Sequence, residues 1–169
     1  MAETLDLGSV RDRDAIDLAT AKNRRIPNAR RSERSPEALA VAQQWIRRRH
    51  PSTRLRSLTA TYNCIGMAFA NRRTCIEPDH VHMILNDDGY VEVSPSEVEP
   101  GDLVLYRDDR GDISHVAVVV RHEPDLEKAL WRTTVLSQWG SDGEYLHDCA
   151  DVNEMLGKPD KFYSERRKA

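Results

Sequence analysis

The sequence predicts one α+β domain in which N-terminal helices pack on an antiparallel β-sheet. Two observations predict this class. Apolar residues recur at helical spacing in the first half of the chain, and from Tyr90 onward the apolar period changes to two, with turn residues between the runs. The length of 169 residues suits a single domain with an extension. We therefore expect a basic, partly mobile extension over residues 1–34 and a domain over residues 35–169.

Three segments have the signals of helices. The first begins at Ser35, whose hydroxyl can cap it, and ends before Pro51. A second helix is expected from Cys64 to Ala70, and a short one around residues 79–86. One apolar stripe of the first helix should face the core: Leu39, Ala42, Trp45 and Ile46.

The strands follow in an antiparallel series. Alternation along the best of them puts His115 and Ala117 on one face and Val116 and Val118 on the other. Residues 99–102 and 108–112 have the composition of turns. The predicted strands are residues 90–93, 103–106, 113–122, 131–139 and 143–147.

Composition excludes several classes of protein. Hydrophobic residues make up 39% of the chain and charged residues 31%, which excludes a wholly disordered chain. The longest apolar run, residues 116–120, is too short to span a bilayer, and the N-terminus lacks the pattern of a secretory signal. Three cysteines without a CxxC pair suit a reducing compartment. We expect a cytoplasmic protein with no membrane partner.

The charge is unevenly distributed along the chain. Residues 21–56 contain eleven Lys or Arg and two Glu, whereas residues 57–169 contain twelve basic and twenty-one acidic residues. Such a basic arm can contact an acidic partner or nucleic acid, or can fold back onto its own domain. Because no aromatic residues alternate with the basic ones, specific nucleic-acid binding is not expected. For residues 1–34 we expect a solvated leader whose deletion leaves the domain folded.

Cys64 and His115 have the positions that thiol catalysis requires. A cysteine in the first turn of a helix is close to free backbone N–H groups, which stabilise a thiolate, and an imidazole on a strand can accept the thiol proton. A third polar group should hold the imidazole in one tautomer. Ser137 and Gln138, at the end of the following strand, are the candidates, and alternation allows only one of them to face His115.

Three motifs in one order resemble the papain-like NlpC and CHAP superfamily. They are Asn63-Cys64-Ile65-Gly66, Pro100-Gly101-Asp102-Leu103-Val104 and Ser114-His115-Val116-Ala117. The resemblance covers about residues 60–147 and implies a papain-like fold with Cys64 as nucleophile and His115 as base. Within Ser137-Gln138-Trp139, Gln138 matches the family's polar third residue better, so we expect Gln138 to contact His115. The chain departs from the family in two respects. It has Asn63-Cys64-Ile65 where many members have Asp-Cys-Ser, and it contains no segment that resembles a wall-binding repeat.

Further residues have two interpretations each. Tyr62 and Asn63 could donate to an oxyanion beside the Cys64 N–H, although helix capping is the preferred interpretation of Asn63. His147 is either a neighbour of the site or exposed. Cys64, Cys75, His80 and His82 could be zinc ligands, but their spacing matches no common zinc site, so we expect neither a metal nor a cofactor. Cys149 is expected to serve packing only.

Two functions remain open from the sequence. The first is a thiol-dependent hydrolase, such as a peptidase or amidase, or an acyl transferase acting on a peptide, amide or thioester. In that case Cys64 would be the nucleophile, and we would expect it to be the most reactive of the three thiols. The alternative is a non-catalytic papain-like module that binds a peptide or partner protein, with residues 21–56 attracting an acidic partner.

Overall fold

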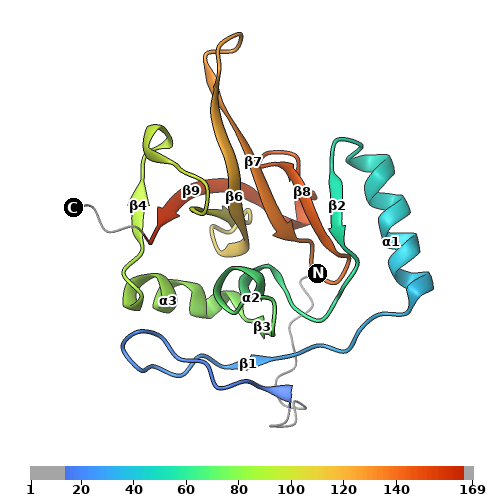
Figure 1. Cartoon of the computed structure of the whole chain (residues 1–169), viewed down its shortest axis with the longest axis vertical. Coiled ribbons are helices and arrows are strands. Elements are labelled where there is room, and N and C mark those ends of the chain that lie inside the picture. The colour runs from blue at the N-terminus through green and yellow to red at the C-terminus, as the bar shows by residue number, and fades with distance from the viewer. Residues whose placement is uncertain (1–13, 166–169) are drawn as a thin grey trace.

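A computed structural model describes residues 14–165 of the chain. These residues form three α-helices and nine strands, and all three helices precede strand β4 (Figure 1). The helices are α1 (Pro36–Arg49), α2 (Cys64–Phe69) and α3 (Val81–Asp87). The strands are β1 (Asn28–Ala29), β2 (Arg54–Ser57), β3 (Cys75–Ile76), β4 (Val91–Val93), β5 (Leu103–Arg107), β6 (Ile113–Asp125), β7 (Leu130–Gln138), β8 (Glu144–Asp148) and β9 (Lys158–Ser164).

Seven strands form one antiparallel sheet in the order β2-β8-β7-β6-β5-β9-β4, and β1 pairs with β3 in a small second sheet. The α+β class and the antiparallel sheet are therefore confirmed. The three predicted helices and five predicted strands are present with small shifts of their ends. The four strands that the sequence did not predict are β1, β2, β3 and β9.

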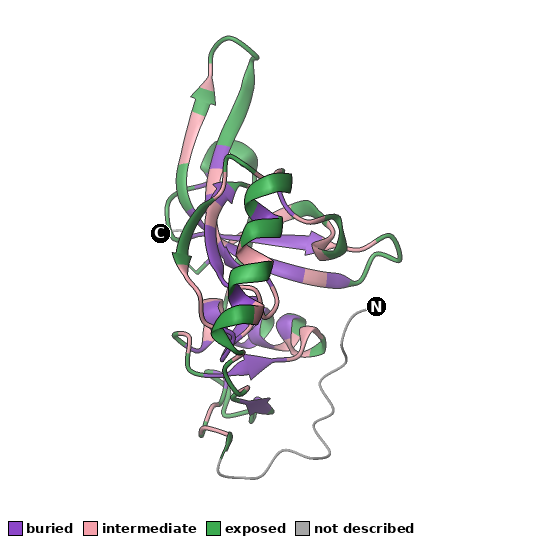
Figure 2. Cartoon of the chain, turned by 90° about the vertical axis from the view of Figure 1, so that its right-hand side faces the viewer, coloured by how far each residue is buried: buried purple, intermediate pink, exposed green. Residues whose placement is uncertain are grey.

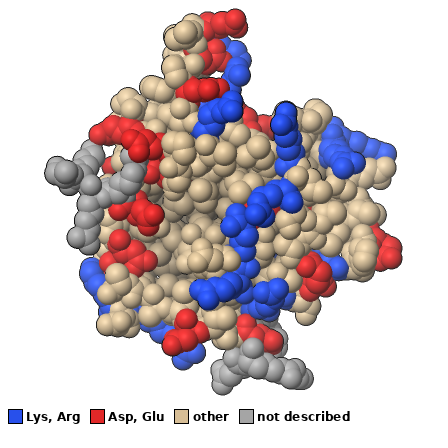
Figure 3. Space-filling model, in the orientation of Figure 1, with Lys and Arg blue, Asp and Glu red and all other residues tan. Residues whose placement is uncertain are grey.

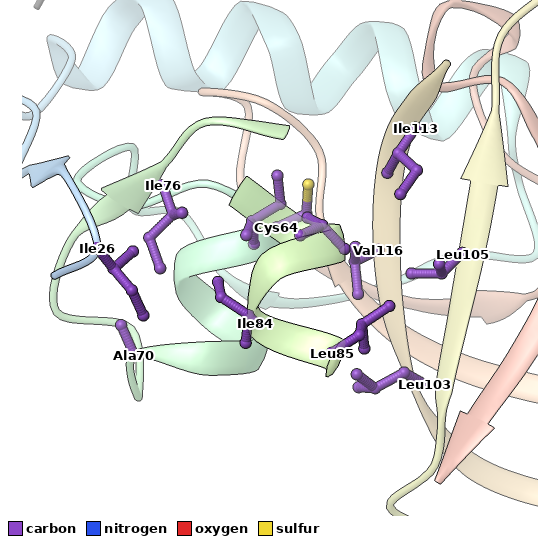
Figure 4. Close-up of a cluster of buried hydrophobic side chains, with 12 residues drawn as sticks. Ile26, Cys64, Ala70, Ile76, Ile84, Leu85, Leu103, Leu105, Ile113 and Val116 are labelled. Atoms are coloured by element: carbon purple, nitrogen blue, oxygen red, sulfur yellow. The ribbon is translucent and has the colours of Figure 1, made fainter. Parts of the chain in front are cut away.

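The sheet has an apolar core on each of its faces. Helices α2 and α3 cover one face, where Cys64 and Ile65 pack with Leu105 and Val116 (Figure 4). We call this the α2 face. Ile46 of α1 helps to cover the opposite face, which we call the α1 face; its core contains Tyr106, Ala117, Val119, Val135 and Trp139. The predicted alternation of strand β6 is thus confirmed, because Val116 and Ala117 belong to different cores.

A β-bulge interrupts the start of β6. Arg107 pairs with Ile113 and Tyr106 pairs with His115, so Ser114 is the extra residue. An extra residue reverses the alternation locally. Ile113 therefore joins the core of the α2 face, while His115, two residues later, lies beside Tyr106 on the α1 face.

Helix α1 begins as predicted but buries a narrower stripe. The Ser35 side chain accepts a hydrogen bond from the Ala38 N–H, and Leu39 and Ile46 are buried. Trp45 was expected in the core, but it is 44% exposed and lies under the Arg49 guanidinium. Most of the helix faces solvent (Figure 2), because two buried side chains are enough to attach it.

The described part of the N-terminal extension, residues 14–34, is docked on the domain, which corrects the expected mobile leader. Ile26 is buried in the core of the α2 face, and Asn28 and Ala29 pair with β3. The Arg24 guanidinium binds both carboxylate oxygens of Asp87 and holds the pKa of that carboxyl below its usual range, and Thr20 also donates to Asp87. The basic arm thus folds back in part, and residues 1–13 lie outside the described residues.

No α-helix within residues 14–165 combines the length and the apolar character that crossing a membrane requires.

We predict that Ile26→Ala destabilises the protein by about 2 to 5 kcal/mol, because it opens a cavity in the core against which the arm is docked. Urea unfolding followed by circular dichroism measures the change. Val41→Ala on the exposed face of α1 is the control and should change stability by less than about 0.5 kcal/mol. An Ile26→Ala variant as stable as the control would mean that the arm is not docked in solution.

Candidate functional site

Cys64 is the first residue of α2, and Asn63 caps this helix. The Asn63 Oδ1 accepts hydrogen bonds from the N–H groups of Gly66 (2.8 Å) and Ile76 (3.1 Å), and its Nδ2 donates to the Ile76 carbonyl (2.7 Å). Every polar atom of this side chain is therefore engaged in holding α2 against β3. The capping interpretation of Asn63 accounts for these contacts, and none of them leaves the amide aimed at an oxyanion.

The Cys64 thiol is 7% exposed and lies in the apolar core of the α2 face. Burial raises the pKa of the thiol to about 11, although hydrogen bonding from the backbone N–H groups of Val116, Ile65 and Cys64 itself favours the thiolate. At neutral pH the protonated thiol therefore predominates. The helix N-terminus acts in the predicted direction, but the loss of solvation outweighs it.

His115 is completely buried on the α1 face of the sheet. Its ring packs edge-on against Tyr106, with 5.0 Å between the ring centroids. Burial first, and the nearby His147 second, lower the pKa of His115 to about 3, so that the ring is neutral at physiological pH. Neither ring nitrogen has a hydrogen-bond partner among the residues that the structure describes.

The structure does not bring Cys64 and His115 together. Tyr106 pairs directly with His115 in the β5–β6 ladder and belongs to the core of the α1 face, whereas Cys64 packs with Val116 on the α2 face. The sheet thus separates the sulfur from the imidazole, and the expected dyad geometry is not formed. The physical reason is the position of α2, which covers the face opposite to the one that His115 occupies.

The expected contact between Gln138 and His115 is wrong. The Gln138 Nε2 donates to the carbonyls of Thr59 (2.8 Å) and Gly140 (3.2 Å). In the β7–β8 ladder Gln138 pairs with Glu144, whose hydrogen-bond partners lie before and after α2. Ser137 instead lies on the same face of the sheet as His115. This agrees with the expectation that only one of Ser137 and Gln138 can face His115. The Oε1 of Gln138 is buried and has no hydrogen-bond partner in the described part of the chain.

Ser137 belongs to a buried hydrogen-bonded group with His147 and Trp139. The Ser137 Oγ and the His147 Nε2 are 2.7 Å apart, and the His147 Nδ1 is 2.8 Å from the Asp148 carbonyl. Since a carbonyl can only accept, Nδ1 carries the proton and Nε2 accepts from Ser137. The Trp139 indole N–H donates to the same two atoms, at 3.2 and 3.3 Å. His147 is therefore buried beside His115 and not exposed.

Tyr62 takes part in a different polar cluster, around the buried carboxylate of Glu144. The Tyr62 hydroxyl donates to Glu144 Oε2 at 2.6 Å, and burial together with this hydrogen bond raises the pKa of Tyr62 to about 12. Arg72 donates to both carboxylate oxygens at 2.8 and 2.9 Å, and Arg56 lies 3.3 Å from Oε1. Tyr62 is thus a structural donor. No sequence motif indicated this cluster, because its members are far apart in the chain.

The remaining cysteines and histidines assemble no metal site. Cys75 is buried, with its Sγ 3.8 Å from the Thr61 carbonyl, and Cys149 is partly exposed. Within residues 14–165 there is no group of three or more His, Cys, Asp or Glu side chains that could hold a metal ion. The possible zinc ligand set of Cys64, Cys75, His80 and His82 is not assembled.

Figure 3 shows basic side chains close together near the centre of one face of the molecule. Arg56 and Arg72 both contact Glu144, and Arg54 lies two residues before Arg56 on the edge strand β2. Arg31 follows β1 and donates its backbone N–H to Thr61. We name these four residues, Arg31, Arg54, Arg56 and Arg72, the arginine band.

We predict that Cys149, and not Cys64, is alkylated first by iodoacetamide at pH 8, since Cys64 and Cys75 are buried. Mass spectrometry of tryptic peptides measures the three rates, and labelling in urea provides the reference in which access is equal. Faster labelling of Cys64 than of Cys149 in the folded protein would contradict the buried, protonated thiol.

We predict that His115 makes the protein acid-sensitive. Its pKa is about 3 in the folded state and near 6.5 when unfolded, so the unfolded state binds the extra proton and stability is lost as the pH falls below about 6.5. The loss should approach about 1.4 kcal/mol per pH unit. Urea unfolding at pH 7 and pH 5 should show a smaller difference for His115→Leu than for the wild type. The exposed His82→Leu control should retain the wild-type difference.

In comparisons with known proteins, no family model, no curated protein and no solved structure matches this chain.

Proposed function

We propose that this chain is a non-catalytic protein-binding module that binds an acidic polypeptide through the arginine band. The observation that carries the proposal is the meeting of Arg56 and Arg72 at one carboxylate, Glu144, with Arg54 on the same strand as Arg56, in a chain with a net charge of −3. A concentrated field of one sign steers and orients a partner of the opposite sign. We place the interaction in the cytoplasm, where three unpaired thiols stay reduced.

Two arginines of the band are available for a partner. Arg31 and Arg54 form no ion pair within 4 Å with an Asp or Glu of residues 14–165. Other parts of the basic arm are already neutralised, because Arg24 binds Asp87 and Arg34 binds Asp142. The attraction of residues 21–56 for an acidic partner is shared with other basic residues, because Arg25, Arg30 and residues 47–49 also form no ion pair within 4 Å with an Asp or Glu of residues 14–165.

The separation of Cys64 from His115 supports a binding function over a catalytic one. A thiol whose pKa is raised by burial, with no base beside it, lacks the activation that nucleophilic catalysis needs. The order of Cys64 helix, Pro-Gly-Asp strand and His115 strand still resembles the papain-like arrangement. We accordingly propose a papain-like scaffold that is used for binding.

We predict that fluorescein-labelled poly-L-glutamate binds the wild type at low salt and that the Arg31→Glu/Arg54→Glu variant binds it at least about tenfold more weakly, which corresponds to about 1.4 kcal/mol. Fluorescence anisotropy titrations measure both. Arg121→Glu/Lys128→Glu is the matched control, because it makes the same charge change on exposed residues of the β6–β7 hairpin. No binding by the wild type, or equal losses in the two variants, would overturn the proposal.

A thiol-dependent hydrolase or acyl transferase is the second candidate. It is favoured by two observations: three backbone N–H groups favour the Cys64 thiolate, and both nitrogens of the buried His115 ring are without a hydrogen-bond partner among the described residues. Such unsatisfied groups are uncommon in folded proteins and often mark functional sites. This function requires β6 to rearrange so that His115 reaches Cys64. Iodoacetamide labelling that is fastest at Cys64 and lost in His115→Ala would establish it over the binding module.

A further inference from the structure

We infer that Arg56 and Arg72 form a binding site for a single anionic group, a carboxylate or a phosphate. We call these two residues the arginine pair. The inference rests on the proposed function and deepens it, since the pair would hold one acidic group of the partner while Arg31 and Arg54 attract the rest.

The arginine pair is built on a buried carboxylate. Glu144 is fully buried, and its two oxygens receive the Arg72 Nε and Nη2 in a bidentate arrangement, with Arg56 Nε 3.3 Å from Oε1. The Tyr62 hydroxyl supplies a further donor to the same carboxylate. Glu144 therefore holds the guanidinium groups of Arg56 and Arg72 close together. Two exposed arginine side chains would not stay together without such a partner, because their like charges repel and their side chains are mobile.

The charges of this group do not cancel. Two guanidinium groups and one carboxylate leave one positive charge, because the Tyr62 hydroxyl is neutral below its pKa of about 12. The contacts with Glu144 use Nε of Arg56 and Nε and Nη2 of Arg72, so Nη1 of each guanidinium remains outside them. The side chains of Arg56 and Arg72 are 50% and 36% exposed, and an anion can reach them from solvent.

The backbone around Arg72 fixes its position in advance. Asn71 and Arg72 both have positive φ, 49° and 65°, a left-handed conformation that residues other than glycine adopt at a cost. The Arg72 N–H donates to the Gly66 carbonyl at 3.1 Å, which closes this turn onto the end of α2. Gly66 in turn lies so close to Thr74 that a Cβ would be 1.7 Å from the Thr74 carbonyl oxygen. A donor that is already ordered loses little conformational entropy when it binds a ligand.

The chemistry of the pair selects oxyanions. Planar guanidinium groups donate paired N–H groups that match the oxygens of a carboxylate or a phosphate. Within the proposed function the source is an Asp or Glu side chain of the partner. Inorganic phosphate offers the same oxygens without a polypeptide, so the two sources can be tested separately.

The test is a titration of the ¹⁵N-labelled full-length protein with N-acetyl-triglutamate amide and, in a second series, with inorganic phosphate. The arginine Nε–Hε resonances report on each guanidinium. We expect saturable shifts of the Arg56 and Arg72 signals in at least one series. In Arg56→Gln the affinity should fall at least about fivefold, about 1 kcal/mol. Stability should change little, because Arg72 and Tyr62 still hold Glu144.

Arg132→Gln, an exposed arginine paired with Asp125 on the hairpin, is the control and should bind as the wild type does. Shifts that do not saturate in either series, or an Arg56→Gln variant with unchanged affinity, would overturn the inference. If poly-L-glutamate still binds in that event, the proposed function survives and the arginine pair is only structural. If the pair binds phosphate but the protein does not bind poly-L-glutamate, the anion site stands and the proposed function fails.

Discussion

The buried carboxylate of Glu144 is the constraint on which the arrangement of the other elements depends. An ionised carboxylate without solvent must be compensated by donors, or it strongly destabilises the fold. Its partners come from three parts of the chain: Tyr62 before α2 and Arg72 after α2 donate hydrogen bonds, and Arg56 on β2 forms an ion pair. Both ends of α2 are thereby tied to strand β8 and to the edge of the sheet. The ion cluster therefore helps to place α2 and the cysteine that begins it, together with the Asn63 contacts to β3 and the apolar core of the α2 face.

That position determines the chemistry available to Cys64. The helix lies on the face of the sheet where Val116 and Leu105 point, and the thiol becomes part of an apolar core. The imidazole of His115 points to the other face, where Ser137 and His147 already satisfy one another. The sheet keeps the two side chains apart, because Val116, which packs with Cys64, and the adjacent His115 project to opposite faces of the same strand. Burial then moves the pKa values of Cys64 and His115 away from each other, so that both groups are neutral at physiological pH.

The same ion cluster leaves a positively charged surface outside. Because Glu144 neutralises only one of its two arginines, the net charge above it is positive, and the neighbouring Arg54 adds to it. The chain as a whole is acidic, so the local charge of this band is opposite in sign to the net charge of the molecule. A surface whose charge is fixed by a buried partner keeps its geometry without a ligand, and preorganisation of this kind favours recognition of an acidic group.

Local signals in the sequence were sufficient to predict most of the secondary structure. Caps such as Ser35 and Asn63, the period-two runs and the turn residues predicted the three helices and five of the strands, since these signals act within a few residues. They also placed Ser137 and Gln138 on opposite faces. Only the tertiary structure decided which face α2 covers, that residues 14–34 dock through Ile26, and where the two-residue strands β1 and β3 pair. These features depend on contacts between residues far apart in the chain, such as Glu144 with Arg72, for which no local pattern exists. The bulge at Ser114, which carries Ile113 to the α2 face, was likewise not indicated by the sequence.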